Sequence, residues 1–248
     1  MKKILTTILK TLLLLVAMGY MVFALVKVSR SPQEMICTGV EYQFTDSGQV
    51  CLIDRSGIEA ILAQHKISPK GQILADINIG DIERYVAASP YVDSVLCYHT
   101  ASGKLCIRVM PLHPMFHVLD EDGNEYYVTA DGQAMPGGKL GADVLVVTGH
   151  VDRGFATSHL VNVCRYITED AYWDDLTEQI YIDRHNNIEI IPRFTGQRIQ
   201  LGDYKDVEDK LRRVRLFYEK GMAKTGWDKY NVVSAAYKGQ IICKKEKR

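Results

Sequence analysis

One apolar run near the start of the chain constrains its fold more than any other feature. The segment Thr11–Val26 reads TLLLLVAMGYMVFALV and carries no charge, and an extension back to Ile4 adds only Lys10 as a charged residue. Such a stretch reaches the ~20 residues that a helix needs to cross a bilayer core. A lysine near one end can extend its ammonium group to the lipid headgroups. The sequence therefore predicts a transmembrane helix here.

A cleaved signal peptide is the alternative, because it also combines a basic start with an apolar core. The run is long for a signal core, and no A-x-A site follows it. Lys2 and Lys3 precede the run while Lys27 and Arg30 follow it, so the positive-inside bias is weak. Long domains, however, are translocated largely regardless of their charge. We expect residues 1–30 to form a cytoplasmic tail and an uncleaved anchor, with the bulk of the chain outside the cytoplasm.

The charged residues are balanced, with 30 basic and 30 acidic side chains. A nucleic-acid-binding protein usually has a basic excess on one face, so this balance gives that class no support. Six cysteines occur without a C-x-x-C pair, so the usual zinc and thioredoxin-like spacings are missing. Cys97 and Cys106 would face each other if a hairpin loop were centred between Ala101 and Ser102. The alternatives there are a disulfide or two buried thiols.

Residues 31–112 have the pattern of a small α+β domain. Turn and breaker residues separate five segments, in which apolar residues either alternate or recur at helical spacing. Prolines at 111 and 114 then stop a strand and mark a boundary. The expected order is a strand over 35–44, helices over 57–65 and 80–88, and strands over 92–99 and 104–110.

Residues 113–248 predict a mostly antiparallel β domain with flanking helices. Asp120–Asn124 has the turn chemistry of a hairpin tip, and Asp203 is expected to cap a late helix. The expected strands cover 115–119, 126–129, 143–148, 179–183, 188–192, 198–201, 230–235 and 239–244, and the expected helices run from Ser158 to Ile167 and from Asp203 to Gly221.

The order of these segments resembles the FtsQ/DivIB family of bacterial division proteins. Members have a short cytoplasmic tail, one membrane span, a POTRA domain and a C-terminal β domain. Met110 and Pro111 replace the family's usual acidic residue and its neighbour, and Thr129 stands where the family has an aspartate. The motifs that carry the likeness by their order and spacing are Ala88–Val92, Leu105–Pro111, Tyr126–Gly132 with Pro136, Gln200–Gly202 with Lys210 and Leu211, and Tyr237.

The resemblance implies an α+β protein in three parts: a tail and transmembrane helix over 1–30, a POTRA-like β-α-α-β-β domain over 31–112, and a C-terminal β domain over 113–248. It implies a non-enzymatic scaffold of the bacterial inner membrane, enriched at the division septum, with its bulk in the periplasm. Such a scaffold would coordinate septal wall synthesis through partners of FtsB and FtsL type, and it would need no cofactor or metal.

Partner binding is expected at the last strand of the chain. A terminal strand often lies at a sheet edge, where its free backbone groups can pair with a strand of another protein. Tyr237 matches the tyrosine in the family's partner-binding strand. The upstream basic helix could meet acidic residues of the partner, or it could simply be a solvated face. The expected partner-binding residues are Val233, Tyr237, Lys238, Gly239, Ile241, Arg212 and Arg215.

A membrane-anchored periplasmic hydrolase acting on envelope polymers is the alternative function. It would need acids that converge in a cleft, whereas the paired acids here lie in polar turns or beyond helix ends. His113 and His117 are four residues apart, but no third metal ligand follows at a recognisable spacing. The glycine-rich stretch 137–141 lacks the phosphate-binding pattern and predicts a loop. The acid pairs considered are Asp120/Asp122, Glu169/Asp170 and Asp174/Asp175.

Overall fold

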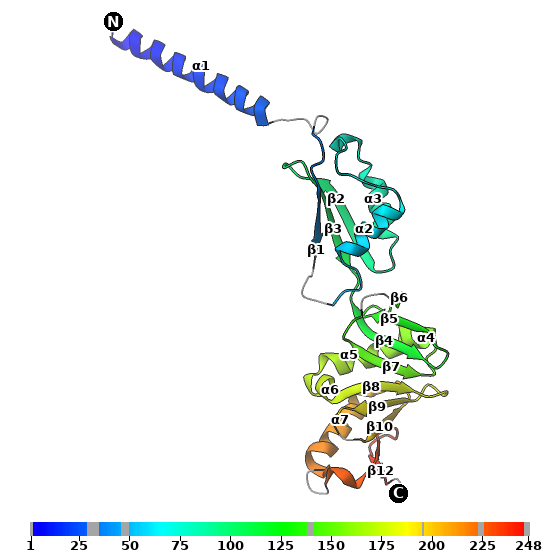
Figure 1. Ribbon diagram of the computed structural model, residues 1–248. Coiled ribbons are helices and arrows are strands. Elements are labelled where there is room, and N and C mark those ends of the chain that lie inside the picture. The colour runs from blue at the N-terminus through cyan, green and yellow to red at the C-terminus, as the bar shows by residue number, and fades with distance from the viewer. Residues whose placement is uncertain are drawn as a thin grey trace. The chain divides into compact units, whose positions relative to one another are not determined.

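The computed structural model describes residues 2–28, 35–45, 50–137, 141–194, 196–222 and 226–245. Three expected segments, the linker at 28–33, the turn at 45–48 and the loop at 137–141, lie wholly or partly outside these residues. The chain divides into two compact units, which are described separately below (Figure 1). One unit takes Met1–Phe44, Arg55–Ala88 and Ser94–Val109, and the other takes Thr45–Asp54, Ser89–Asp93 and Met110–Arg248.

The apolar run near the start is helical, as predicted. Helix α1 covers Lys2–Val28, and leucine, methionine and alanine in the run are good helix formers. Its described apolar side chains are exposed, Leu13 and Tyr20 being 72% and 73% accessible. Within the described residues, however, no helix combines the length and apolar character needed to cross a membrane. The membrane anchor therefore stays a prediction.

The first unit has the predicted β-α-α-β-β order. Its sheet has the strand order β1-β3-β2, with β1 parallel to β3. Ile58 and Leu62 of the first helix and Ile82 and Val86 of the second are buried, and they repeat at the helical spacing read from the sequence. The elements are β1 (Val40–Phe44), α2 (Arg55–Gln64), α3 (Ile79–Ala87), β2 (Val92–His99) and β3 (Leu105–Pro111).

The turn between β2 and β3 corrects the predicted cysteine pairing. The amide of Thr100 donates to the carbonyl of Lys104 over 2.9 Å, which closes the hairpin one residue away from the predicted centre. Counting back along the strands places Tyr98, and not Cys97, opposite Cys106. A one-residue shift moves a side chain to the other face of a strand. All six thiols are free, so of the two alternatives left open by the sequence, buried thiols hold for Cys97 and Cys106.

The second unit is built on a nine-stranded sheet with the order β12-β11-β10-β9-β8-β7-β4-β5-β6. Every expected strand has a counterpart, and β6 is additional. Five of its eight strand pairs are antiparallel, as expected, but β4–β7, β7–β8 and β10–β11 are parallel, so the sheet is mixed. The strands are β4 (Pro114–Asp120), β5 (Glu125–Thr129), β6 (Ala134–Pro136), β7 (Leu145–Gly149), β8 (Thr177–Ile182), β9 (Ile188–Pro192), β10 (Arg198–Gly202), β11 (Val232–Ser234) and β12 (Ile242–Lys244).

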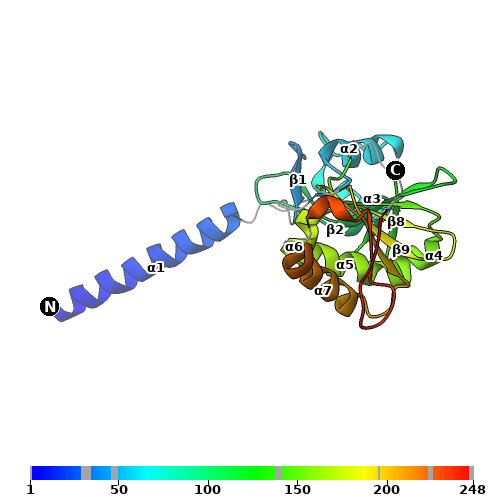
Figure 2. The ribbon, with the colours of Figure 1, turned by 90° about the horizontal axis from the view of Figure 1, so that it is seen from below.

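Helices cover one face of this sheet (Figure 2). Two parallel connections, β7 to β8 and β10 to β11, require crossovers, and right-handed crossovers in the same direction place their helices on the same side. Buried residues from these helices and from the strands form one core. A smaller cluster of Leu52, Tyr127 and Met135 is separate from it. The helices are α4 (Arg153–Phe155), which continues through a π-turn at Ala156–Leu160 into α5 (Val161–Glu169), then α6 (Ala171–Leu176) and α7 (Val207–Phe217).

Helix α7 confirms one expectation and corrects another. Its apolar stripe of Val207, Leu211, Val214 and the following Tyr218 is buried, each residue being at most 8% accessible. Asp203 does not cap the helix, since the residue at the N-cap is Asp206 and makes no side-chain cap. The Asp203 carboxylate instead accepts a hydrogen bond from the buried Lys210 ammonium over 2.5 Å.

Candidate functional site: the open C-terminal edge

Strand β12 lies at the end of the nine-stranded sheet, as expected for the last strand. It pairs antiparallel with β11 over only three residue pairs, from Val232↔Lys244 to Ser234↔Ile242. Among the described strands it has a neighbour on one side only. An edge strand presents backbone N–H and C=O groups that can pair with a strand from another chain. We refer to β12 and its preceding loop, 235–241, as the C-terminal edge.

The structure divides the expected binding residues between the loop surface and the core. Tyr237 is 59% accessible, and Lys238 and Gly239 are also exposed. Val233 is fully buried in β11, and Ile241 is half-buried against the main core. Val233 can therefore stabilise β11, the strand that pairs with β12, whereas Tyr237 and Lys238 are available for contact with a partner.

Arg213 of α7 holds the loop of the C-terminal edge in place. Its guanidinium donates to the carbonyls of Tyr237 over 2.9 Å, Gln240 over 2.6 Å and Ala235 over 3.1 Å. It also donates to the Asp209 carboxylate over 2.8 Å, and its side chain is only 12% accessible. In the sequence Arg213 is one of four cations in a basic cluster on the late helix, with Lys210, Arg212 and Arg215, and nothing in that cluster indicates this role. The i,i+4 spacing from Asp209 was the available signal.

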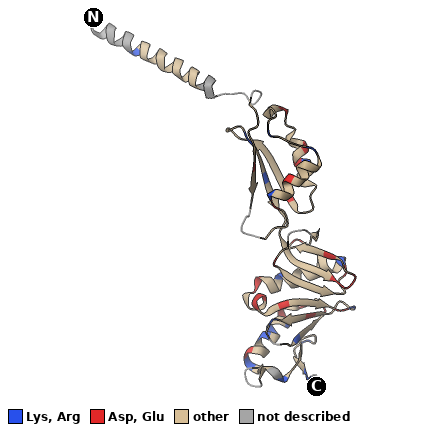
Figure 3. Ribbon diagram, in the orientation of Figure 1, with Lys and Arg blue, Asp and Glu red and all other residues tan. Residues whose placement is uncertain are grey.

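The other members of the basic cluster have separate environments. Arg212 is 69% accessible and forms an exposed ion pair with Asp209. Arg215 donates to Glu219 over 3.0 Å and lies 4.5 Å from the ring centroid of Tyr172. Lys210 is buried against Asp203. Figure 3 shows basic residues along α7 and near the C-terminus, but these contacts leave Arg212 as the freest cation of the four.

A polar hollow of about 380 Å³ adjoins the C-terminal edge. Tyr237, Ile242 and Lys244 line it from the edge, and Glu189 and Gln200 line it from the neighbouring strands. Gln200 donates to the Glu189 carboxylate over 2.8 Å.

Two of the acids considered for hydrolysis, Asp120 and Asp170, have structural roles. Asp120 accepts hydrogen bonds from the amides of Asp122 and Asn124 and from the Asn124 side chain. Partial desolvation would raise the pKa of Asp120, but these bonds outweigh it and lower the pKa below its ordinary value. Asp170 caps α6 through the amides of Tyr172 and Trp173. The lowered pKa of Asp120 does not suit a proton donor, which would need a raised pKa.

The two histidines considered as metal ligands bind other groups. A ring nitrogen of His113 lies 3.1 Å from the carbonyl of Val50. His117 lies 3.1 Å from the Glu125 carboxylate and stacks on Tyr127 with ring centroids 4.2 Å apart. Among the described residues no cluster of three or more histidine, cysteine, aspartate or glutamate side chains could hold a metal ion.

Comparison with known families identifies first the class of protein and then its family. Residues 35–110 match the POTRA-like domain, which makes the chain a POTRA-bearing protein with a second α+β unit that ends in an open strand. Residues 113–244, more than half of the chain, match the family described as FtsQ/DivIB, C-terminal related. The chain belongs to the FtsQ/DivIB family, whose members are non-catalytic division proteins, and this implies a role in cell division. No curated protein matches the chain.

Proposed function

We propose that this protein is a membrane-anchored divisome scaffold that binds other single-span division proteins through the C-terminal edge. The observation that carries the proposal is the unpartnered side of β12 next to the exposed Tyr237 ring. Main-chain pairing at an edge supplies affinity, and a neighbouring aromatic side chain supplies a specific anchor. The family match supports a division role for such binding.

The partners that fit this edge are proteins of FtsB and FtsL type with an extended segment. Arg213 fixes the loop in advance, so less conformational entropy is lost when a partner binds. Arg212, which is exposed and paired with Asp209, can turn to meet an acidic side chain of the partner. The scaffold would thereby couple the partners to septal wall synthesis. The apolar α1 helix would anchor it in the inner membrane, with the N-terminus cytoplasmic and both compact units in the periplasm.

Substitution of Tyr237 tests the proposal. Tyr237→Ala should abolish or weaken by at least tenfold the capture of FtsB- and FtsL-type partners, because anchor residues at interfaces are worth ~2 kcal/mol or more. The variant should lose less than ~0.5 kcal/mol of unfolding free energy, since the ring is 59% accessible. Partner capture by the full-length chain and urea denaturation measure the two effects.

Tyr166→Ala provides the matched control. Tyr166 is another exposed tyrosine, 37% accessible, on the outer side of α5. Its removal should leave partner capture unchanged. A well-folded Tyr237→Ala protein that captures its partners at normal strength would exclude the binding role of this residue.

A further inference from the structure

An unpaired hydroxyl marks a second surface on the same unit. Tyr126 of β5 is only 7% accessible, and its hydroxyl has no hydrogen-bond partner among the described residues. A buried polar group without a partner costs free energy and is uncommon in folded proteins. Tyr126 therefore points to a ligand that supplies the missing hydrogen bond.

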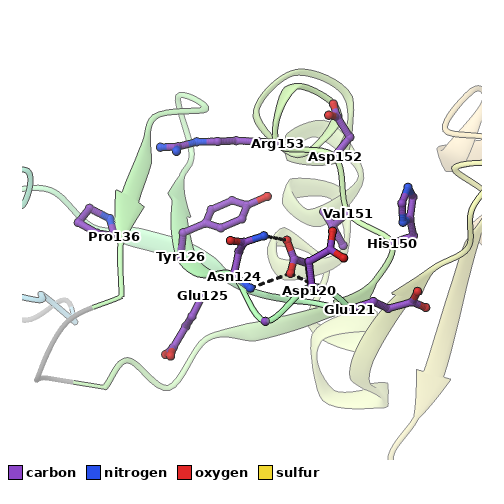
Figure 4. Close-up of a pocket in the computed structure, with 12 residues that line it drawn as sticks. Asp120, Glu121, Asn124, Glu125, Tyr126, Pro136, His150, Val151, Asp152 and Arg153 are labelled. Carbon is purple, nitrogen blue, oxygen red and sulfur yellow. Dashed lines mark hydrogen bonds between the residues drawn. The ribbon is translucent and has the colours of Figure 1, made fainter.

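The hydroxyl is directed into a hollow of about 730 Å³ (Figure 4). The turn between β4 and β5 forms one side of the hollow, and the segment that begins α4 forms the other. Arg153 lies over the Tyr126 ring, 5.6 Å from its centroid, and the hydroxyl has less than 1 Å² of exposed surface. Arg153 is exposed and has no ion pair among the described residues, so its side chain can turn away from the ring and open a path to the hydroxyl.

The charges around this hydroxyl favour a cationic ligand. Five acidic residues line the hollow against a single guanidinium, that of Arg153, although the Glu125 carboxylate points away from the hydroxyl and binds His117. The remaining excess of carboxylates repels anions. The Asp122 carboxylate is exposed and has no hydrogen bond or ion pair within the described chain. The described acids do not form a metal-binding group, so an organic cation fits better than a metal ion. The five carboxylates are those of Asp120, Glu121, Asp122, Glu125 and Asp152.

We propose that this hollow binds lysine or arginine side chains in a short basic segment of a partner protein. The cationic group donates to the Asp122 carboxylate and to the Tyr126 hydroxyl oxygen. This surface is separate from the C-terminal edge, because β4 and β5 lie at the opposite end of the strand order from β12. The inference therefore goes beyond the scaffold role of that edge.

The protonation state of Tyr126 is compatible with this contact. Desolvation, together with the nearby Asp120, raises the pKa of Tyr126 to about 12, although Arg153 opposes the shift. The hydroxyl therefore stays neutral at physiological pH, and its oxygen keeps lone pairs that can accept a hydrogen bond from a cation.

Fluorescence anisotropy with two labelled peptides, tetra-arginine and tetra-glutamate, tests the proposal on the full-length chain in a non-ionic detergent. Tetra-arginine should bind saturably, and its binding should weaken as salt is added, because these charges are exposed. Tyr126→Phe removes only the hydroxyl and should weaken binding about tenfold, as expected for one hydrogen bond to a charged group. Asp122→Asn should weaken binding by a similar factor.

Two controls separate this site from general charge and from misfolding. Asp175→Asn makes the same charge change at an exposed acid of α6 and should leave the affinity for tetra-arginine unchanged. Tyr126→Phe should unfold at the same temperature as the natural protein or higher, because the lost hydroxyl has no partner in the free chain.

Four results would overturn the proposal. They are the absence of saturable tetra-arginine binding, preferential binding of tetra-glutamate, an unchanged affinity in a folded Tyr126→Phe protein, and an equal loss in Asp122→Asn and Asp175→Asn.

Discussion

At the scale of single residues, the neighbouring arginines of α7, Arg212 and Arg213, have different structural roles. Arg213 is largely buried and bonds to three carbonyls of the C-terminal edge, whereas Arg212 is exposed and bonds only to Asp209. Hydrogen bonds from both arginines, that of Arg213 first, hold the pKa of Asp209 below its ordinary value. Proximity in sequence therefore does not make these residues equivalent.

Arg213→Ala should destabilise the protein by ~2–3 kcal/mol, because hydrogen bonds from a charged group are lost at several carbonyls together. Arg213→Lys should be intermediate, since an ammonium group cannot reproduce the planar fork of a guanidinium. Arg212→Ala should change the stability by less than ~0.5 kcal/mol. Urea denaturation measures all three variants. Equal effects at positions 212 and 213 would contradict the role of Arg213 in holding the loop.

The ion pair of Asp203 with Lys210 makes the stability of the protein depend on pH. The hydrogen bond from Lys210, and its charge, lower the pKa of Asp203 despite partial desolvation. The folded protein therefore binds fewer protons at this site than the unfolded chain does. The contribution to stability is present above the ordinary pKa of about 3.9 and is lost as the pH falls through the lower folded-state value.

Thermal unfolding of Asp203→Asn and the natural protein measures this effect. The natural protein should be the more stable of the two at pH 6, and the difference should shrink steadily between about pH 4 and pH 2. Asp175→Asn, at an exposed acid of α6, is the control for the change of charge alone. A gap for Asp203→Asn that stays constant down to pH 2 would exclude the ion pair as its source.

At the scale of elements, a glycine allows the close approach of β7 and β8. Gly149 has φ +100°, and a Cβ at this position would lie 2.2 Å from the carbonyl oxygen of Ile182. Gly123, in the turn between β4 and β5, has a similar φ of +83° but open space around it. A comparison of substitutions at these two glycines therefore distinguishes the cost of backbone strain, present at both, from the cost of a steric collision, present only at Gly149.

Gly149→Ala should cost ~3 kcal/mol or more, because both the backbone and the strand that follows must shift. Gly123→Ala should cost only the ~1–2 kcal/mol of a left-handed backbone. The free energies of unfolding of the two variants provide the measurement. Similar losses at both positions would show that the contact with Ile182 is unimportant.

The sequence predicts the identity of most elements but not their pairing. The alternation in β9 and the helical spacing in α2, α3 and α7 depend on local burial, so periodicity reveals them. The start of the helix at Arg153 was missed because Gly154 and the hydroxyl residues after it are poor helix formers. The parallel pairs in the second unit bring together strands that are distant in sequence, and no local pattern specifies such neighbours.

Only part of the candidate site could be predicted, because the sequence indicates its elements but not how they pair. The edge position of the last strand follows from a general tendency of terminal strands. Val233 is buried within β11, whereas Tyr237 is exposed in the loop that follows, and the sequence does not specify where β11 ends. The unpaired hydroxyl of Tyr126 gives no signal in the sequence, because tyrosine is common in strands.

At the scale of the whole molecule, anchoring decides on which side of a membrane both units work. Protease added to spheroplasts should degrade the bulk of the chain if α1 is an uncleaved anchor and the rest lies outside the cytoplasm. Immunoblotting against the second unit, before and after membrane lysis, measures this protection. A mature form that begins near residue 30 and is released by washing would contradict the anchor.

The short pairing of the last strands, β10 to β12, also affects how long the protein persists in the cell. Strands β10, β11 and β12 are joined by three residue pairs at each step, far fewer than a long hairpin would provide. Strands at such a weakly paired edge open locally at a lower free energy than the strands at the centre of the sheet do. A strand from a partner would raise that opening free energy, because it binds the closed form alone. Chains without a partner would then present a fraying end to cellular proteases, so the amount of this protein would follow the amount of its partner.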